Sequence, residues 1–150
     1  MKILKLYLTI IMFFCTTAVF AGGVGYIDYQ KVMENYLFAK TTMTEIQNKH
    51  DEIQKYLEQK ETEFNKLETP LQKQKFEATV QNELRTKETA FNDFREKKEE
   101  AVYTRIHAVS EKIRLEKGLD AILDVRSVFS GGVDITDELI KTLNSGGGIR

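Results

Sequence analysis

The chain holds few side chains of the types that carry out chemistry, and their spacing favours structural roles. Two histidines, His50 and His107, stand too far apart in the sequence to form a metal-ligand motif. Asp134, Asp137 and Glu138 could bind a metal or exchange a proton. Acidic residues also collect at the start of a helix, where they cap it and are attracted by its dipole. We expect this capping role for the three carboxylates.

No catalytic motif can be recognised in the sequence. There is no glycine-rich loop followed by Lys and Ser or Thr that could hold a phosphate group. No nucleophile, base and orienting group stand at a recognisable spacing. The single cysteine, Cys15, follows the bulky Phe14, whereas a lipid-attachment site needs a small residue there. The sequence therefore predicts no enzymatic activity, no cofactor and no metal site.

Residues 1–21 are typical of a secretory signal peptide. Lys2 and Lys5 precede an apolar run, and Val19 and Ala21 occupy the two positions that signal peptidase reads before its cleavage point. The apolar run approaches the length of a membrane span, so an uncleaved anchor is the alternative. We expect export and cleavage after Ala21.

The composition beyond residue 21 limits the protein class further. Without the signal peptide the chain has no cysteine, so it forms no disulfide. Loss of two lysines from the 22 basic residues leaves 20 against 23 acidic residues, a balance that does not favour nucleic-acid binding. The apolar content is too low for a large globular core in a chain this short. We therefore expect an elongated or oligomeric protein.

The middle of the chain, residues 31–117, predicts a long antiparallel helical hairpin. Its apolar residues recur in alternating steps of four and three, which is typical of a coiled coil. Pro70 interrupts this pattern, and the apolar positions on its two sides can be paired, so that Phe64 faces Val80. The pairing predicts an arm whose tip lies near residues 69–73.

The two ends of the expected mature chain, 22–30 and 118–144, predict a small β-containing body. Short β-favouring runs occupy residues 24–28 and 121–125, and 128–130 could form a third strand. Strands this short need partners, so we expect other copies of the chain to complete the core. The residues expected to form this oligomerisation body are Val24, Tyr26, Ile27, Ile122, Leu123, Val125, Val128 and Phe129.

The last part of the chain predicts a short helix and a tail. Gly118 follows several cations and suits the C-terminus of the long helix. A short helix is expected over residues 137–143, with Asp134 or Thr136 as its cap. Residues 145–150 are expected to form a flexible tail.

Both ends of the chain resemble the Skp/OmpH family of periplasmic chaperones. Residues 25–32 are similar to the family's opening segment, and residues 118–124 with 133–144 are similar to its closing strand, turn and helix. The resemblance covers essentially the whole mature chain, while the charged middle matches any coiled coil. It implies a periplasmic homotrimer with a central barrel of strands, from which three helical hairpins hang around a cavity.

The function that the resemblance implies is that of an ATP-independent holdase, which binds unfolded outer-membrane or other envelope proteins and prevents their aggregation. A structural or tethering coiled coil with one fixed partner is the alternative. The family's namesake is strongly basic, whereas this chain is slightly acidic, so the binding of lipopolysaccharide or a membrane surface is in doubt. Apolar residues near the tip that clients could contact, or that could simply pack in the seam, are Phe64, Leu67, Leu71 and Phe76.

Overall fold

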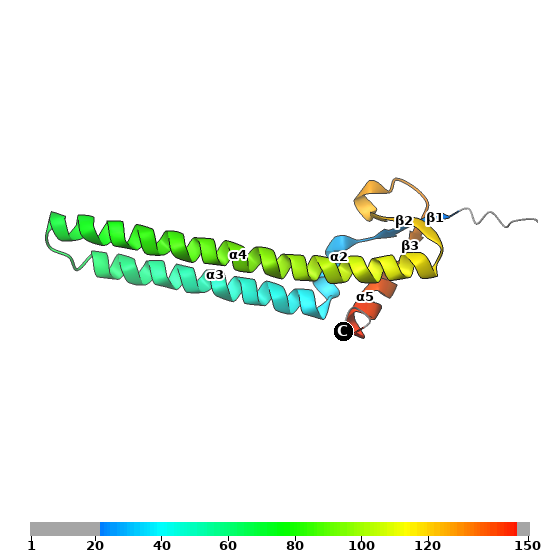
Figure 1. The fold of residues 1–150 in the computed structure, drawn as a ribbon, viewed down its shortest axis with the longest axis horizontal. Coiled ribbons are helices and arrows are strands. Elements are labelled where there is room, and N and C mark those ends of the chain that lie inside the picture. Colours follow the sequence, from blue (N-terminus) through cyan, green and yellow to red (C-terminus); the bar gives the residue numbers. More distant parts are fainter. Residues whose placement is uncertain (1–21, 147–150) are drawn as a thin grey trace, which may run out of the picture.

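The computed structural model describes residues 22–146, in which two long helices run side by side from a small body of strands and short helices (Figure 1). The predicted fold class, mostly α with a small β body, is confirmed. The predicted signal peptide lies outside the described residues, as does most of the predicted tail. The elements in chain order are β1 (Gly23–Ile27), α2 (Tyr29–Asn35), α3 (Leu37–Phe64), α4 (Pro70–Glu116), β2 (Leu119–Asp124), a 3-10 turn (Val125–Ser127), β3 (Val133–Asp134) and α5 (Thr136–Asn144).

The two arm helices, α3 and α4, are joined by a turn over residues 65–69. A capping box begins α4: the Gln72 N–H donates to the Thr69 hydroxyl at 3.3 Å, and the Thr69 N–H donates to the Gln72 side chain at 3.1 Å. Pro70 follows the cap directly, where its missing N–H leaves no helical hydrogen bond unmade. The prediction placed the tip at 69–73, but these residues are the cap and first turn of α4.

The earlier turn changes which side chains meet across the arm. The ring of Phe64 lies 6.3 Å from that of Phe76, measured between centroids. The sequence pairing instead placed Phe64 opposite Val80, one helical turn further along α4. The difference arises because Pro70 begins the second helix and does not interrupt it, so α4 starts sooner than the pairing assumed.

The first arm helix does not continue unbroken into the body, which the sequence pattern did not predict. Tyr36 separates α2 from α3 with an extended backbone, at φ −80° and ψ 113°. Its side chain is only 4% exposed, and its ring lies 5.9 Å from that of Phe38. Burial of this one aromatic side chain holds the backbone in a conformation that interrupts the helix.

The three strands form a parallel sheet in the order β2-β1-β3. The first two predicted strands are confirmed as β1 and β2, but the candidate third strand at 128–130 is wrong. The third strand is Val133–Asp134, after Gly131 and Gly132 turn the chain with positive φ angles of 80° and 92°. The 3-10 turn at Val125–Ser127 leads the chain away from the sheet before it returns.

The core of the molecule lies where the base of α4 meets α2, α5 and the sheet. An apolar stripe along the last third of α4 is almost fully buried there, so this helix belongs to the arm at one end and to the body at the other. The core residues are Ile27, Val32, Tyr36, Ala39, Val102, Ile106, Val109, Ile113, Leu119, Ile135, Leu139 and Leu143.

Candidate functional site

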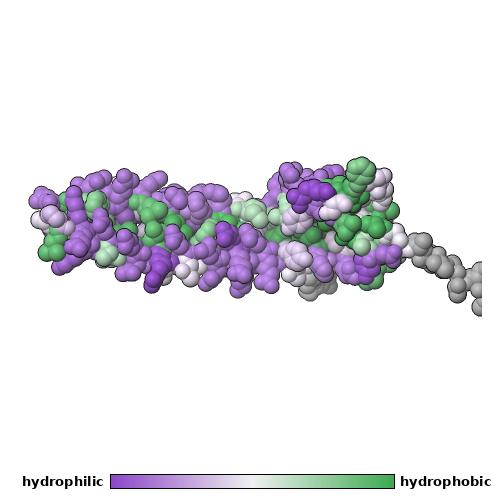
Figure 2. All heavy atoms as spheres, turned by 90° about the horizontal axis from the view of Figure 1, so that it is seen from above, coloured by the Kyte–Doolittle hydropathy of each residue, from purple (hydrophilic) through white to green (hydrophobic). Residues whose placement is uncertain are grey.

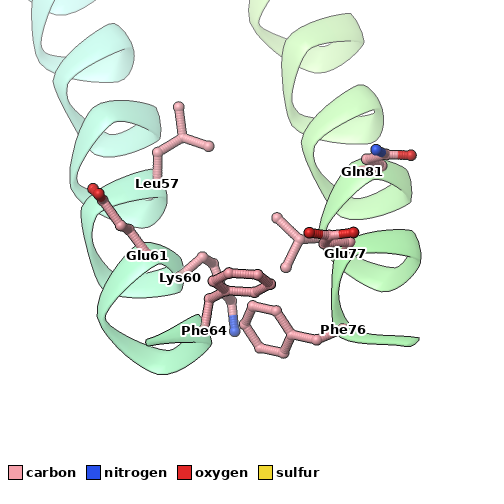
Figure 3. A pocket seen from close by; sticks show the side chains of 8 residues that line it. Leu57, Lys60, Glu61, Phe64, Phe76, Glu77 and Gln81 are labelled. Atoms are coloured by element: carbon pink, nitrogen blue, oxygen red, sulfur yellow. The ribbon is translucent and has the colours of Figure 1, made fainter. Parts of the chain in front are cut away.

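A groove lies between the two arm helices close to the tip (Figure 3). Its volume is about 330 Å³. In Figure 3 the rings of Phe64 and Phe76 lie together at the tip end of the groove, with Leu57 further along α3. The apolar residues that line it are Leu57, Phe64, Phe76 and Val80, and the polar ones are Lys60, Glu61, Glu77 and Gln81.

Two lysines place positive charge over the aromatic rings of this tip groove. The Lys60 Nζ lies 5.6 Å from the centroids of both Tyr56 and Phe76, and the Lys73 Nζ lies 5.2 Å from that of Phe64. Lys60 also pairs with Glu63 at 2.8 Å, and this hydrogen bond raises the pKa of Lys60. Lys60 therefore stays charged near neutral pH. The tip groove can accept an apolar or aromatic side chain with a cation beside it.

The structure brings together only part of the predicted client-contact set. Phe64 and Phe76 both line the tip groove, whereas Leu71 is 61% exposed and does not. Leu67 lies in the turn and is partly buried. Sequence reasoning missed Leu57, although its place in the apolar seam of the first helix was a usable signal. Lys60 was not predicted as a groove residue. The sequence pattern does not tell whether a lysine in the seam lines a groove or points into solvent.

The second notable surface lies on the body. Val24 pairs with Ala121 and Tyr26 with Leu123 across the β1–β2 ladder, so these side chains share one face of the sheet. Val24 and Leu123 remain 38% and 40% exposed. Figure 2 shows apolar residues gathered over the body as well as in broken patches along the arm. The body therefore leaves apolar side chains of β1 and β2 open to solvent on one face.

The predicted body residues divide into core and surface. Ile27 is buried in the core and Ile122 packs against it. Val128 is partly buried. Phe129 is fully exposed on the loop between the 3-10 turn and β3. The exposed large apolar side chains of the three strands and of the segment between β2 and β3, which we call the exposed body set, are Val24, Leu123, Val125, Phe129 and Val133.

The acidic residues near α5 have structural partners. The Asp134 carboxylate accepts a hydrogen bond from the Thr136 N–H at 2.9 Å, and the hydrogen bonds from Thr136 lower the pKa of Asp134. Asp137 pairs with Lys31 at 2.8 Å, and Glu138 pairs at the same distance with Lys117, the residue that follows α4. The N-cap residue of α5 is Ile135, and no side chain makes a capping hydrogen bond there, so the predicted cap at Asp134 or Thr136 is wrong. Asp134 holds the N–H of the first helical residue, while Asp137 and Glu138 lie in the first turn of α5 and fasten it to α2 and to the end of α4.

Within residues 22–146 the side chains form no candidate metal centre. No group of three or more metal-ligating side chains gathers in this part of the chain. His50 lies beside Phe91 and His107 beside Tyr103, each with ring centroids 5.9 Å apart. No helix of the same segment is long and apolar enough to cross a membrane.

The fold defines a protein with one helical-hairpin arm on a small sheet-containing body. Residues 23–143 match the family described as outer membrane protein (OmpH-like), so the chain belongs to this family. A solved structure from Caulobacter crescentus CB15, described as that of a candidate outer membrane chaperone (OmpH-like), shares the fold with a TM-score of 0.61. It is 15% identical, and the match covers 83% of this chain and 85% of that one. No curated protein matches the chain. The predicted family is confirmed.

Proposed function

We propose that this protein is an ATP-independent holdase chaperone of the periplasm, which binds unfolded outer-membrane or other envelope proteins and keeps them soluble. The observation that carries the proposal is the tip groove, an open aromatic surface far out on the arm. Membership of the OmpH-like family, and the fold shared with a candidate outer membrane chaperone, support it. An unfolded chain offers many apolar side chains to such a surface. Each contact is weak, so a client is held by their sum and released when its own folding competes.

The same proposal includes assembly into a homotrimer. The exposed body set is apolar, and β2 and β3 are the two edges of the described sheet, with backbone groups on their outer sides that have no strand partner. Contact between the bodies of several copies would bury the exposed body set. It would also give strand partners to the free backbone groups of β2 and β3. Three arms would then project from one joint body, and a client held between them would be shielded from other unfolded chains.

Light scattering of residues 22–150 tests the proposal, first with the protein alone and then with an unfolded outer-membrane β-barrel protein added. We expect a trimer that takes the client into a soluble complex of defined mass. An unrelated unfolded envelope protein should be kept soluble as well, because a holdase does not depend on one partner. A monomer or dimer that leaves both clients to precipitate would contradict the proposal and favour a tethering coiled coil.

A pair of variants connects the tip groove to this activity. Phe64→Ala with Phe76→Ala removes both rings of the groove, and we expect it to raise the concentration of chaperone needed to suppress aggregation by a few-fold. Gln74→Ala is the matched control, because this polar side chain is exposed near the same tip, does not line the groove and is not a predicted client contact. Equal potency of the double variant and the control would show that clients do not use the groove.

A further inference from the structure

A second groove lies at the base of the arm, where α2, α3 and α4 meet, and it differs in chemistry from the tip groove. We call it the base groove, and its volume is about 440 Å³. Three of its walls are carboxylates on one stretch of α4, whereas its other walls are aromatic and apolar. The residues that line it are Tyr29, Met33, Met43, Glu96, Glu99, Glu100, Val102 and Tyr103.

The carboxylates of the base groove have no cation of their own. Within residues 22–146, neither an ion pair nor a side-chain hydrogen bond involves Glu96, Glu99 or Glu100. Two of the neighbouring cations are engaged elsewhere: Lys98 pairs with Glu45, and the Arg105 guanidinium lies 3.9 Å from the centroid of Phe38. Lys97 lines a shallow neighbouring groove with Glu100, so three carboxylates face one lysine without an ion pair in the described residues. The groove therefore presents negative charge that the fold itself does not neutralise.

The aromatic rings of the base groove point to the same ligand. Along the arm, the rings of Phe38, Tyr56, Phe64, Phe76, Phe91 and Phe94 each have a lysine or arginine of this chain over them. In the part of the chain that the structure describes, no such contact involves Tyr29 or Tyr103, and Tyr103 is 59% exposed. These two rings can still accept a cation from outside.

The two methionines make part of the lining of the base groove adaptable. Met33 is partly buried, and Met43 is 39% exposed. Unbranched thioether side chains change shape at low cost and suit surfaces that bind varied partners. Met33 and Met43 can contact the aliphatic part of a lysine or arginine side chain while its charged end reaches the carboxylates.

We propose that the base groove binds lysine- or arginine-bearing segments of unfolded client chains. This inference rests on the proposed holdase function, because it specifies which client segments the base of the arm selects. An anionic or uncharged segment would have to desolvate three carboxylates without compensation, so it is disfavoured. Clients would then be held at two chemically different places, with aromatic and apolar side chains at the tip and cationic ones at the base.

Binding of two labelled peptides, measured by fluorescence anisotropy, tests this proposal. Both peptides are unstructured, have the same length and share their apolar residues, but one carries lysine and arginine where the other carries glutamate and aspartate. We expect the basic peptide to bind roughly tenfold more tightly, as several exposed ion pairs and one cation–π contact would give. The preference should shrink at about 0.5 M salt, which screens exposed charges.

Glu96→Gln with Glu99→Gln and Glu100→Gln should remove the preference and leave the arm folded. The matched control is Glu58→Gln with Glu88→Gln and Asp93→Asn, since these exposed arm carboxylates also form no ion pair but lie outside the groove. Tyr103→Leu should weaken the basic peptide alone. Equal binding of both peptides to the unchanged protein, or equal loss in both triple variants, would overturn the inference.

Two further measurements separate the explanations. If the Glu96, Glu99 and Glu100 variant changes the oligomer mass in light scattering, a second copy of the chain occupies the groove and the inference is wrong. If the basic peptide binds as expected but no client is kept soluble, the base groove stands as a binding site and the holdase proposal fails. If clients are kept soluble without any preference for the basic peptide, the holdase stands and the groove inference fails.

Discussion

The side-chain amide of Asn144, the last residue of α5, accepts a hydrogen bond from the backbone N–H of Leu37, the first residue of α3, at 2.9 Å. Its NH₂ group donates to the carbonyl of Asn35 at the same distance. The break at Tyr36 takes both backbone groups out of the regular helical pattern. One amide from the far end of the chain therefore satisfies both sides of the break and ties the arm to the body.

Asn144→Ala should loosen this joint. We expect the free energy of unfolding to fall by about 1 kcal/mol, because water can replace the lost hydrogen bonds at this exposed position. Amide hydrogen exchange at Leu37 should become faster. Asn144→Asp should fall between, since it keeps the acceptor and loses the donor. The control is Lys141→Ala on the same helix, and equal effects of Asn144→Ala and this control would refute the role.

The two glycines before β3 should differ in their tolerance of a side chain. Gly132→Ala places a methyl group 3.1 Å from the Val24 carbonyl oxygen at a φ of +92°. Gly131→Ala meets nothing within 4 Å, so it carries only the cost of its positive φ, about 1 kcal/mol. We expect Gly132→Ala to lower the midpoint of urea unfolding more than Gly131→Ala does. Equal midpoints would show that β1 moves away from the added methyl group at little cost in free energy.

Tyr56 should ionise at unusually high pH. Partial burial raises its pKa, and the hydrogen bond that its hydroxyl donates to Glu83 at 2.5 Å raises it further, to about 12. A raised pKa for this acid means that the neutral form stabilises the folded arm. The stabilisation is complete below pH 10 and disappears as the pH rises from 10 toward 12.

An absorbance titration of the phenolate band checks this expectation, with Tyr56→Phe to identify the contribution of Tyr56. Glu83→Gln should lower the pKa of Tyr56 without returning it to 10, because burial remains. If Tyr56 titrates near 10 in the unchanged protein, its hydroxyl is solvated and the arm does not hold it against Glu83 in solution.

Phe129 separates the stability of one chain from that of an assembly. Its side chain is fully exposed, so Phe129→Ser should leave the unfolding free energy of an isolated chain within about 0.5 kcal/mol of its original value. If the exposed body set forms the contact between copies, the same change should shift the light-scattering mass toward the monomer at low micromolar concentration. Thr79→Ser, on the arm, is the control. An unchanged mass would place Phe129 outside the contact.

The sequence predicted the arm well because a coiled-coil seam repeats over many residues, so local errors average out. Val102, Ile106, Val109 and Ile113, which lie within the predicted helical segment 31–117, form a buried stripe. Where one residue decides the backbone, prediction failed. Tyr36 breaks a helix without any glycine or proline, because its conformation depends on burial against elements far along the chain.

The body shows the same limit. A β-favouring composition identified β1 and β2, but 128–130 had similar composition and forms no strand. The third strand begins only after the chain has turned at Gly131 and Gly132, which brings Val133 and Asp134 beside β1 in parallel register. The base groove was not anticipated, since its carboxylates look like any solvated helix face until Tyr29 and Met33 are placed opposite them.

The uninterrupted course of α4 makes the arm mechanically asymmetric. Its 47 residues span roughly 70 Å, and its C-terminal part is buried in the body core. The body therefore fixes the direction of α4. The other arm helix, α3, is separated from α2 by the break at Tyr36 and is bound there to Asn144. A bulky client that presses into the arm would therefore displace α3 and widen the gap between the helices, while α4 keeps its direction. The volume available to a client would then increase because the two helices of one arm separate. The whole arm would not have to move relative to the body.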